Sequence, residues 1–182
     1  MLKVDVHVHT QFSPDSEVSL ERIVERCVQV GLDCVAITDH NTIEGAVAVQ
    51  ANAPFMVIVG EEVRSAQGEI TGLFLTEVVP KGLSAVETAE RIKDQGGLVS
   101  IPHPFDRFRK GVISSNALSV LLPYIDVVEE FNARNNMSAD DTKAREFANK
   151  HGILTSAVSD SHTTMEIGRT YMEMPEFDGT AK

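Results

Sequence analysis

The sequence predicts an α/β protein whose buried, largely parallel sheet closes into a small or incomplete barrel. Short apolar runs alternate with helix-like segments along the chain, and the runs are rich in Val and Ile, which is typical of strands buried on both faces. A complete eightfold barrel typically takes about 250 residues. The chain has 182 residues, so an incomplete barrel in one domain spanning 1–182 fits the length better.

The first half of the chain supplies strand–helix units followed by two consecutive strands. Strands are expected at 2–8, 33–38, 55–63 and 69–75, and helices at 19–30 and 42–51. Ser19 is a suitable N-cap for the first helix and Gly31 a suitable end. Pro54 ends the second helix, and Gly68 lies in the loop between the two consecutive strands.

The second half continues the alternation. Helices are expected at 84–95, 115–122 and 138–151, and strands at 98–101, 124–131, 153–159 and 170–174. Gly96 and Gly152 follow two of these helices, and Pro102 stops the strand at 98–101. The sequence stops soon after 170–174, where a further helix would be expected to cover that edge.

Composition excludes several classes of protein. Hydrophobic residues make up 42% and charged residues 24%, so a folded core can form. The formal net charge of −11 argues against a broad basic surface for duplex DNA or anionic membranes. No apolar run approaches the ~20 residues of a membrane-spanning helix, and no signal peptide is evident. With only Cys27 and Cys34 there is no disulfide framework, so a cytoplasmic location is expected.

Five of the six histidines lie at the carboxyl ends of expected strands. His7 and His9 end the first strand, and His40, His103 and His162 follow later ones. In an α/β barrel these strand ends converge on one face, where sites are built. Because strand side chains alternate, the two imidazoles of His-Val-His lie on the same side and can bind one cation.

Carboxylates accompany these histidines. They are Asp15, Glu61, Glu62 and Asp160. Imidazole together with carboxylate suits Zn, Mn or Fe, and no thiolate is needed. Asp5 and Asp39 are candidates to orient imidazoles, with an ordinary role as strand-end or turn carboxylates as the alternative. The sequence therefore predicts a metal centre at one end of the barrel.

The motifs DVHVHTQFSPDS, AITDHNT, GEEVRS, IPHPFD and SDSH occur in this order over nearly the whole chain. Together they resemble the PHP family, named for polymerase and histidinol phosphatase domains. The resemblance implies a distorted (β/α)7 TIM-like barrel that holds two or three divalent metal ions (Mn, Zn, Fe or Mg) and hydrolyses phosphate esters. Histidinol phosphatase, nucleoside 3′,5′-bisphosphate phosphatase and short-RNA exonuclease activities occur within that family.

The resemblance also implies which residues hold the ions. His7, His9, Glu62 and Asp160 would hold the first, Asp15, His40 and His162 the second, and Glu62 with His103 the third. The family pattern G-x-E-[VI]-x-[ST] selects Glu62 over Glu61. A further ligand of the third ion would come from the strand near 129–132. Some family members have His or Cys there, whereas this chain offers Asn132, Glu129 or Glu130 as candidates. The chain also differs at 69–72, where a His is common in the family and the sequence here is EITG.

The expected chemistry is attack of a metal-activated water on phosphorus. Asp15, His40 and His162 are the candidates to manage protons, without a sequence-based choice of general acid. Arg107, Arg109 and Lys110 follow His103 directly, and with Arg134 they are the preferred cations for a substrate phosphate. The expected substrate is a small phosphorylated metabolite, a nucleotide or a short oligonucleotide.

Two other functions remain open. A metal amidohydrolase also uses a barrel and an HxH pair, but usually needs a strand-end Lys, and the seven lysines avoid the expected strand ends. A non-catalytic metal-binding module of the same family would be expected to have lost several ligands, whereas the first two sets are intact.

Overall fold

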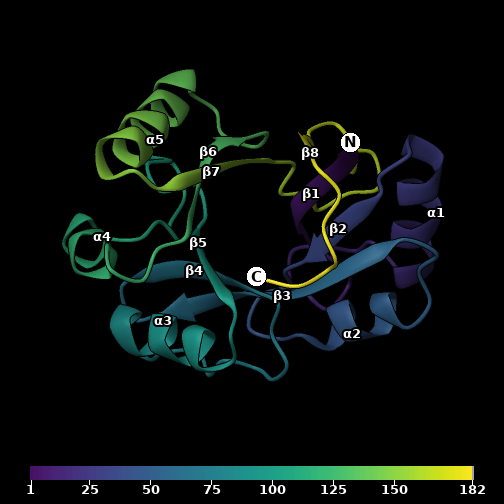
Figure 1. The fold of residues 1–182 in the computed structure, drawn as a ribbon, viewed down its shortest axis with the longest axis horizontal. Helices are drawn as coiled ribbons and strands as arrows, with labels where there is room; N and C mark the ends of the chain where they lie inside the picture. The colour runs from purple at the N-terminus through teal and green to yellow at the C-terminus, as the bar shows by residue number, and fades with distance from the viewer. Residues whose placement is uncertain (182) are drawn as a thin grey trace.

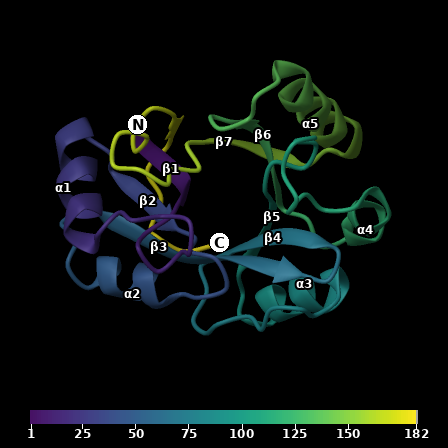
Figure 2. The same ribbon diagram turned by 180° about the vertical axis from the view of Figure 1, so that it is seen from behind.

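The computed structural model of the protein describes residues 1–181. One eight-stranded sheet, in the order β7-β6-β5-β4-β3-β2-β1-β8, curls into a nearly closed barrel with helices on its outside (Figures 1 and 2). The strands are β1 (Leu2–Val8), β2 (Cys34–Ile37), β3 (Met56–Ser65), β4 (Gly68–Leu73), β5 (Leu98–Ile101), β6 (Val127–Asn132), β7 (Leu154–Val158) and β8 (Met172–Met174). The helices are α1 (Leu20–Val30), α2 (Glu44–Gln50), α3 (Ala85–Asp94), α4 (Ser115–Leu121) and α5 (Ser138–His151).

The predicted distorted (β/α)7 TIM-like barrel is confirmed, and the distortion has a specific source. Neighbours among β1, β2 and β3, and among β5, β6 and β7, pair in parallel. Strand β4 follows β3 after a tight turn and is antiparallel to both β3 and β5. The β3–β4 connection therefore contains no helix, as the loop expected around Gly68 predicts.

Barrel closure brings the first and last parts of the chain together at the carboxyl ends of the strands. Val8 and Ser161 form a parallel bridge, and the backbone N–H of His9 donates to the Ser161 carbonyl at 3.0 Å. At the opposite end of the barrel, β8 pairs antiparallel with Leu2–Val4 of β1. The backbone on either side of Asp160 is thereby fixed next to the end of β1.

The expected elements form, with small changes at their ends. Ser19 caps α1 by accepting the Arg22 N–H, and Gly31 ends the helix in the left-handed conformation (φ 70°). Strand β6 begins at 127 rather than at 124, because the chain first makes a turn in which the Tyr124 N–H donates to the Leu121 carbonyl. No helix within residues 1–181 is long and apolar enough to cross a membrane.

Alternation along the strands builds two apolar layers. On one face of β2, Val35 and Ile37 pack with the helices, and on the other Cys34 and Ala36 belong to a smaller cluster inside the barrel. Met174 and Phe177 pack against that inner cluster. The segment after β8 runs across this end of the barrel (Figure 1, yellow). This apolar cluster fills one end of the barrel interior, and polar side chains occupy the opposite end.

A buried carboxylate ties the ends of β1 and β2 together at that polar end. Asp39 accepts hydrogen bonds from the Thr10 N–H (2.7 Å), the Thr10 hydroxyl (2.7 Å) and the Ser13 hydroxyl (2.7 Å). Gly45 of α2 packs directly on this group, since a Cβ there would lie 2.1 Å from Asp39 Oδ2 and 2.6 Å from Thr10 Oγ1. The glycine is required by close approach rather than by its backbone conformation.

Gly45→Ala is expected to destabilise the protein, although the same change in an open helix position stabilises by about 1 kcal/mol. The added methyl must displace Asp39, and overpacking of this kind costs about 1–3 kcal/mol. Urea denaturation measures the effect, with Glu146→Ala on the exposed face of α5 as the near-neutral control. A midpoint equal to or above the wild-type value would contradict the close packing.

Candidate metal centre

All eight predicted metal-ligating side chains gather at the polar end of the barrel. His7 and His9 lie at the end of β1, His40 follows β2, Glu62 lies in β3, His103 follows β5, and Asp160 and His162 follow β7, while Asp15 comes from the loop after β1. Two of these positions have left-handed backbones that side chains rarely adopt, with φ 32° at His103 and 51° at Asp160. The ends of strands distant in sequence thus converge as expected.

Four side chains form the first cluster. Nε2 of His7 lies 3.0 Å from Nε2 of His9. Oε2 of Glu62 lies 3.4 Å and 3.5 Å from these two nitrogens, and Oδ1 of Asp160 lies 3.6 Å and 3.4 Å from them. All four side chains are almost fully buried, and Asp160 Oδ1 has no hydrogen-bond partner. Converging lone pairs around an orphaned buried oxygen fit a cation better than a hydrogen-bond network.

Outer partners hold three imidazoles with Nε2 facing inward. Nδ1 of His7 lies 2.6 Å from Glu129 Oε1, and Nδ1 of His9 lies 3.0 Å from the Ser13 hydroxyl. Nδ1 of His162 lies 2.9 Å from the Asp160 backbone carbonyl. Donation from Nδ1–H in each case leaves the Nε2 lone pair available for a ligand role. Asp39 contributes indirectly, through Ser13, rather than by contacting an imidazole.

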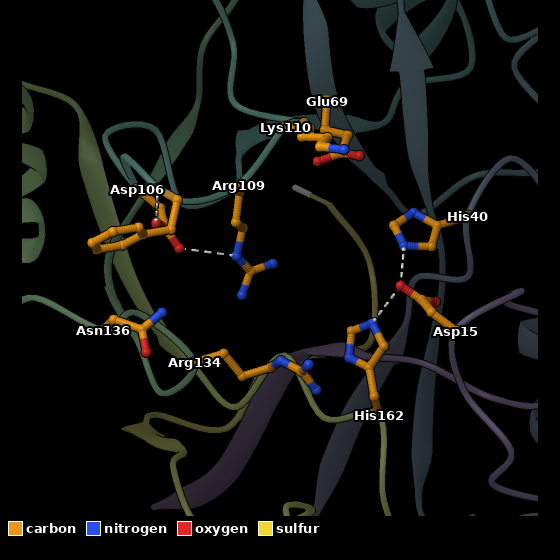
Figure 3. A pocket seen from close by; sticks show the side chains of 11 residues that line it. Asp15, His40, Glu69, Asp106, Arg109, Lys110, Arg134, Asn136 and His162 are labelled. Atoms are coloured by element: carbon orange, nitrogen blue, oxygen red, sulfur yellow. Dashed lines mark hydrogen bonds and ion pairs between the residues drawn. The ribbon is translucent and has the colours of Figure 1, made fainter.

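Asp15, His40 and His162 form the second cluster. Oδ2 of Asp15 lies 3.4 Å from His40 Nε2 and 3.2 Å from His162 Nε2 (Figure 3). The cluster adjoins the first, because the rings of His9 and His162 have centroids 4.2 Å apart. Asp15 has 54% of its side chain exposed, so this cluster opens to solvent while the first does not.

Glu62, Glu69 and His103 form a third group of converging donor atoms. Nε2 of His103 lies 3.1 Å from Glu62 Oε1 and 3.9 Å from Glu69 Oε2. None of the three candidates left open on β6 joins this group among the described residues. Glu129 contacts His7, Asn132 donates to Glu129 and Asp160, and Glu130 pairs with Arg145. Glu69 of β4 is nearer, at the segment where the sequence lacks the expected His.

Neighbouring histidines and Arg109 lower the pKa values of the buried carboxylates in this region. Burial by itself would raise the pKa of Asp160, but His7, His9 and Arg109 hold that pKa well below its usual range. Burial would likewise raise the pKa of Glu62, but His7 and His103 keep this pKa well below its usual range. Both carboxylates therefore stay ionised only because positive charge or donors surround them.

The second cluster (Asp15, His40 and His162) lines a cavity of about 350 Å³, together with Glu69 (Figure 3). Arg109, Lys110 and Arg134 supply three cationic side chains to its lining. Arg107, predicted to contact a substrate phosphate, does not line it, because its guanidinium binds Asp140 through Nε and Nη2 on the far side of the loop. Arg109 and Arg134, the other two predicted arginines, do line the cavity.

Arg109 is held by two acidic groups. Its Nε donates to Asp106 Oδ2 at 3.1 Å, and its Nη2 forms an ion pair with Asp160 Oδ2. Asn132 Nδ2 donates to the same Asp160 oxygen at 3.1 Å. Asp160 is thereby oriented with its other oxygen, Oδ1, toward the two imidazoles of β1.

Several contributing residues are missed by sequence reasoning. Ser13, Glu69 and Asp106 lie beside recognised motifs but carry no spacing that distinguishes them from surface residues. Glu129 is considered only as a third-site ligand, whereas it contacts His7 and accepts the His103 N–H at 2.9 Å. Only the folded arrangement of neighbouring strands reveals these roles.

Comparison with known proteins identifies relatives of the chain. It is 34% identical over 180 residues to an uncharacterized protein of Methanocaldococcus jannaschii, covering 97% of this chain and 72% of that protein. A two-domain protein of Bacteroides vulgatus containing a predicted PHP-like metal-dependent phosphoesterase superposes with a TM-score of 0.75 at 19% identity over 91% of this chain. This chain spans about half of that two-domain protein, 53% of its length.

A third relative is an amidohydrolase from Chromobacterium violaceum with bound sulfate and no metal. It has a TM-score of 0.74 at 16% identity, over 94% of this chain and 92% of its own. At such low identities the two solved structures establish the fold alone. Residues 5–118 match the family model of the PHP domain and residues 138–182 match the PHP-associated model. The chain therefore belongs to the PHP domain family.

Proposed function

We propose that this protein is a metal-dependent phosphoesterase that hydrolyses small phosphate esters. The observation that carries the proposal is the placement of two imidazole–carboxylate clusters beside a cavity lined by three cationic side chains. The coarser part, a metal-dependent hydrolase, is supported by family membership and by the phosphoesterase domain of the similar B. vulgatus protein. The substrate class and a multinuclear centre are the finer part of the proposal.

Seven of the eight predicted ligands would hold two ions in this function. His7, His9, Glu62 and Asp160 would hold one divalent ion, and Asp15, His40 and His162 a second, with Mn²⁺, Zn²⁺, Fe²⁺ or Mg²⁺ as candidates. Ions bound there would neutralise phosphoryl oxygens and lower the pKa of a bound water. The nearly complete burial of the first cluster would exclude bulk water from that side of the reacting phosphorus.

Residues lining the cavity would bind the substrate and handle protons. The guanidinium groups of Arg109 and Arg134 can each donate hydrogen bonds to phosphate oxygens. Asp15 lies half-exposed between His40 and His162, and against the effect of burial these imidazoles lower its pKa, so its carboxylate would accept a proton rather than donate one. The cavity volume of about 350 Å³ suits a small metabolite or one nucleotide unit, including the end of a short oligonucleotide.

The alternatives predict different outcomes. A metal amidohydrolase would turn over amides or lactams rather than phosphate esters. It usually needs a lysine at a strand end, whereas Lys110, the lysine that lines the cavity, lies in the loop between β5 and α4. A non-catalytic module would bind metal without hydrolysing any ester. Both are tested by the substrate panel below.

Treatment with a chelator is expected to abolish phosphoesterase activity, and Mn²⁺ is expected to restore it. The panel contains a nucleoside monophosphate, a nucleoside bisphosphate, a sugar phosphate, a trinucleotide and a chromogenic phosphomonoester. Released phosphate or nucleotide is measured after metal content has been determined. If fully loaded protein hydrolyses none of them, the phosphoesterase proposal fails.

Glu129→Gln is expected to weaken metal binding without unfolding the protein. Glu129 accepts from Nδ1 of His7, and loss of such an outer partner typically costs about 10–100-fold in metal affinity. Mn²⁺ titration of metal-free protein measures the change. Glu130→Gln is the matched control, because the neighbouring carboxylate pairs with Arg145 on the surface. Equal affinities in the two variants would exclude the role given to Glu129.

Arg109→Gln is expected to lower kcat/KM by about 10²-fold or more, since it removes a cation that lines the cavity beside Asp160. Arg107→Gln is the matched control two residues away, with its guanidinium bound to Asp140 instead of facing the cavity. Steady-state kinetics are compared at equal metal content. Similar losses in both variants would mean that the loop as a whole, rather than the Arg109 cation, determines activity.

A further inference from the structure

The family resemblance implies a third ion held by Glu62 and His103; we propose that Glu69 is its further ligand in this chain and makes this oxygen-rich position prefer a hard divalent ion such as Mn²⁺ or Mg²⁺ over Zn²⁺. Glu69 supplies its distinguishing ligand, a carboxylate from β4. The inference rests on the proposed function, because Glu62 is shared with the first cluster. It adds that this chain discriminates between ions at different positions of one centre.

The two oxygens of Glu62 face different neighbours. Oε2 is directed to His7, His9 and His40, at 3.4, 3.5 and 3.1 Å. Oε1 is directed to His103, at 3.1 Å. A cation beside Oε1 would therefore use an oxygen that the first cluster leaves free.

The geometry of β3 and β4 aims Glu69 at this position. Arg64 and Glu69 are cross-strand partners, and Arg64 Nη1 donates to Glu69 Oε1 at 2.9 Å. The other oxygen, Oε2, lies 3.9 Å from His103 Nε2. One oxygen is thus held by an arginine while the other faces the cavity, where Figure 3 shows the Glu69 carboxylate.

The backbone opposite leaves room for the Glu69 carboxylate. The Glu69 N–H donates to the Gly111 carbonyl at 2.7 Å. A Cβ at Gly111 would lie 1.7 Å from Glu69 Oε2, so any side chain there would have to displace the carboxylate. Glycine at 111 therefore keeps the inward position of Glu69 open.

His103 provides the nitrogen ligand and is itself rigidly placed. Its side chain is fully buried, and its backbone N–H donates to Glu129 Oε2 at 2.9 Å. Its Nδ1 has no hydrogen-bond partner. Because Nε2 faces both carboxylates, the imidazole points into the proposed site from the side opposite β3.

The balance of oxygen and nitrogen donors determines which ion each position prefers. The first cluster has two imidazoles and two carboxylates and the second has two imidazoles and one carboxylate. The group with Glu69 has two carboxylates and one imidazole, and is the one in which oxygen donors outnumber nitrogen donors. Imidazole suits Zn²⁺, and carboxylate oxygens with water suit Mg²⁺ and Mn²⁺. Glu69 is 14% exposed and lines the cavity, so water or substrate oxygens can complete the coordination there.

The test is a count of ions on metal-free protein, with Mn²⁺ followed by electron paramagnetic resonance and Zn²⁺ by equilibrium dialysis. We expect wild-type protein to bind three equivalents of Mn²⁺, but the third equivalent of Zn²⁺ at least about tenfold more weakly than the first two. Glu69→Gln should weaken the third Mn²⁺ by about 10–100-fold or more, because a direct ligand matters at least as much as an outer partner. Its first two equivalents should be unchanged.

Further variants separate ligand loss from structural damage. Glu69→His restores a nitrogen ligand and should make the third Zn²⁺ tight while weakening the third Mn²⁺. Arg64→Gln breaks the same ion pair but keeps the carboxylate, so it should retain three Mn²⁺. Glu77→Gln, at an exposed position, is the control for charge alone. Thermal unfolding verifies that each variant is folded.

The outcomes distinguish this inference from the proposed function. Fewer than two ions on wild-type protein would contradict both. Two or three ions with identical binding by wild-type and Glu69→Gln protein would overturn only the ligand role of Glu69. Loss of the third ion in Arg64→Gln as large as in Glu69→Gln would overturn the ligand role and assign Glu69 to the ion pair.

Discussion

The burial of Glu62 among four imidazoles is the constraint on which the polar end of this barrel depends. Its two oxygens contact His7, His9, His40 and His103, which come from three different strand ends. An ionised carboxylate with 1% exposure is costly unless positive charge compensates it. The surrounding donor set is therefore arranged for a cation, and the strands must converge closely enough to supply it.

Convergence is enforced by hydrogen bonds outside the donor set. Asp39 joins the end of β2 to the loop after β1 through Thr10 and Ser13, and Ser13 in turn contacts His9. Glu129 joins β6 to His7 and to the backbone of His103. Neither carboxylate belongs to the converging donor groups found within residues 1–181, yet both help to orient imidazoles. The polar end of the barrel therefore contains acidic residues in addition to those predicted to bind metal.

The formal net charge of −11 acquires a different meaning in the folded protein. Part of this negative charge lies on Asp15, Glu62 and Asp160. These carboxylates contact histidine side chains of the metal centre instead of facing solvent alone. Arg109, Lys110 and Arg134 meanwhile line the cavity next to them. These three cations balance Asp15, Glu69 and Asp106 in the same lining, so the opening is less acidic than the protein as a whole, and bulk charge does not exclude an anionic substrate.

The sequence by itself determined the alternation of strands and helices, the family and the convergence of histidines, because these follow from local periodicity and from motifs at strand ends. It could not place Glu69, which joins His103 only because β4 turns back antiparallel between β3 and β5. Nor could it separate Arg107 from Arg109, whose side chains diverge toward Asp140 and Asp160. Side-chain direction in a loop depends on partners distant in sequence, and only the tertiary structure brings those partners into reach.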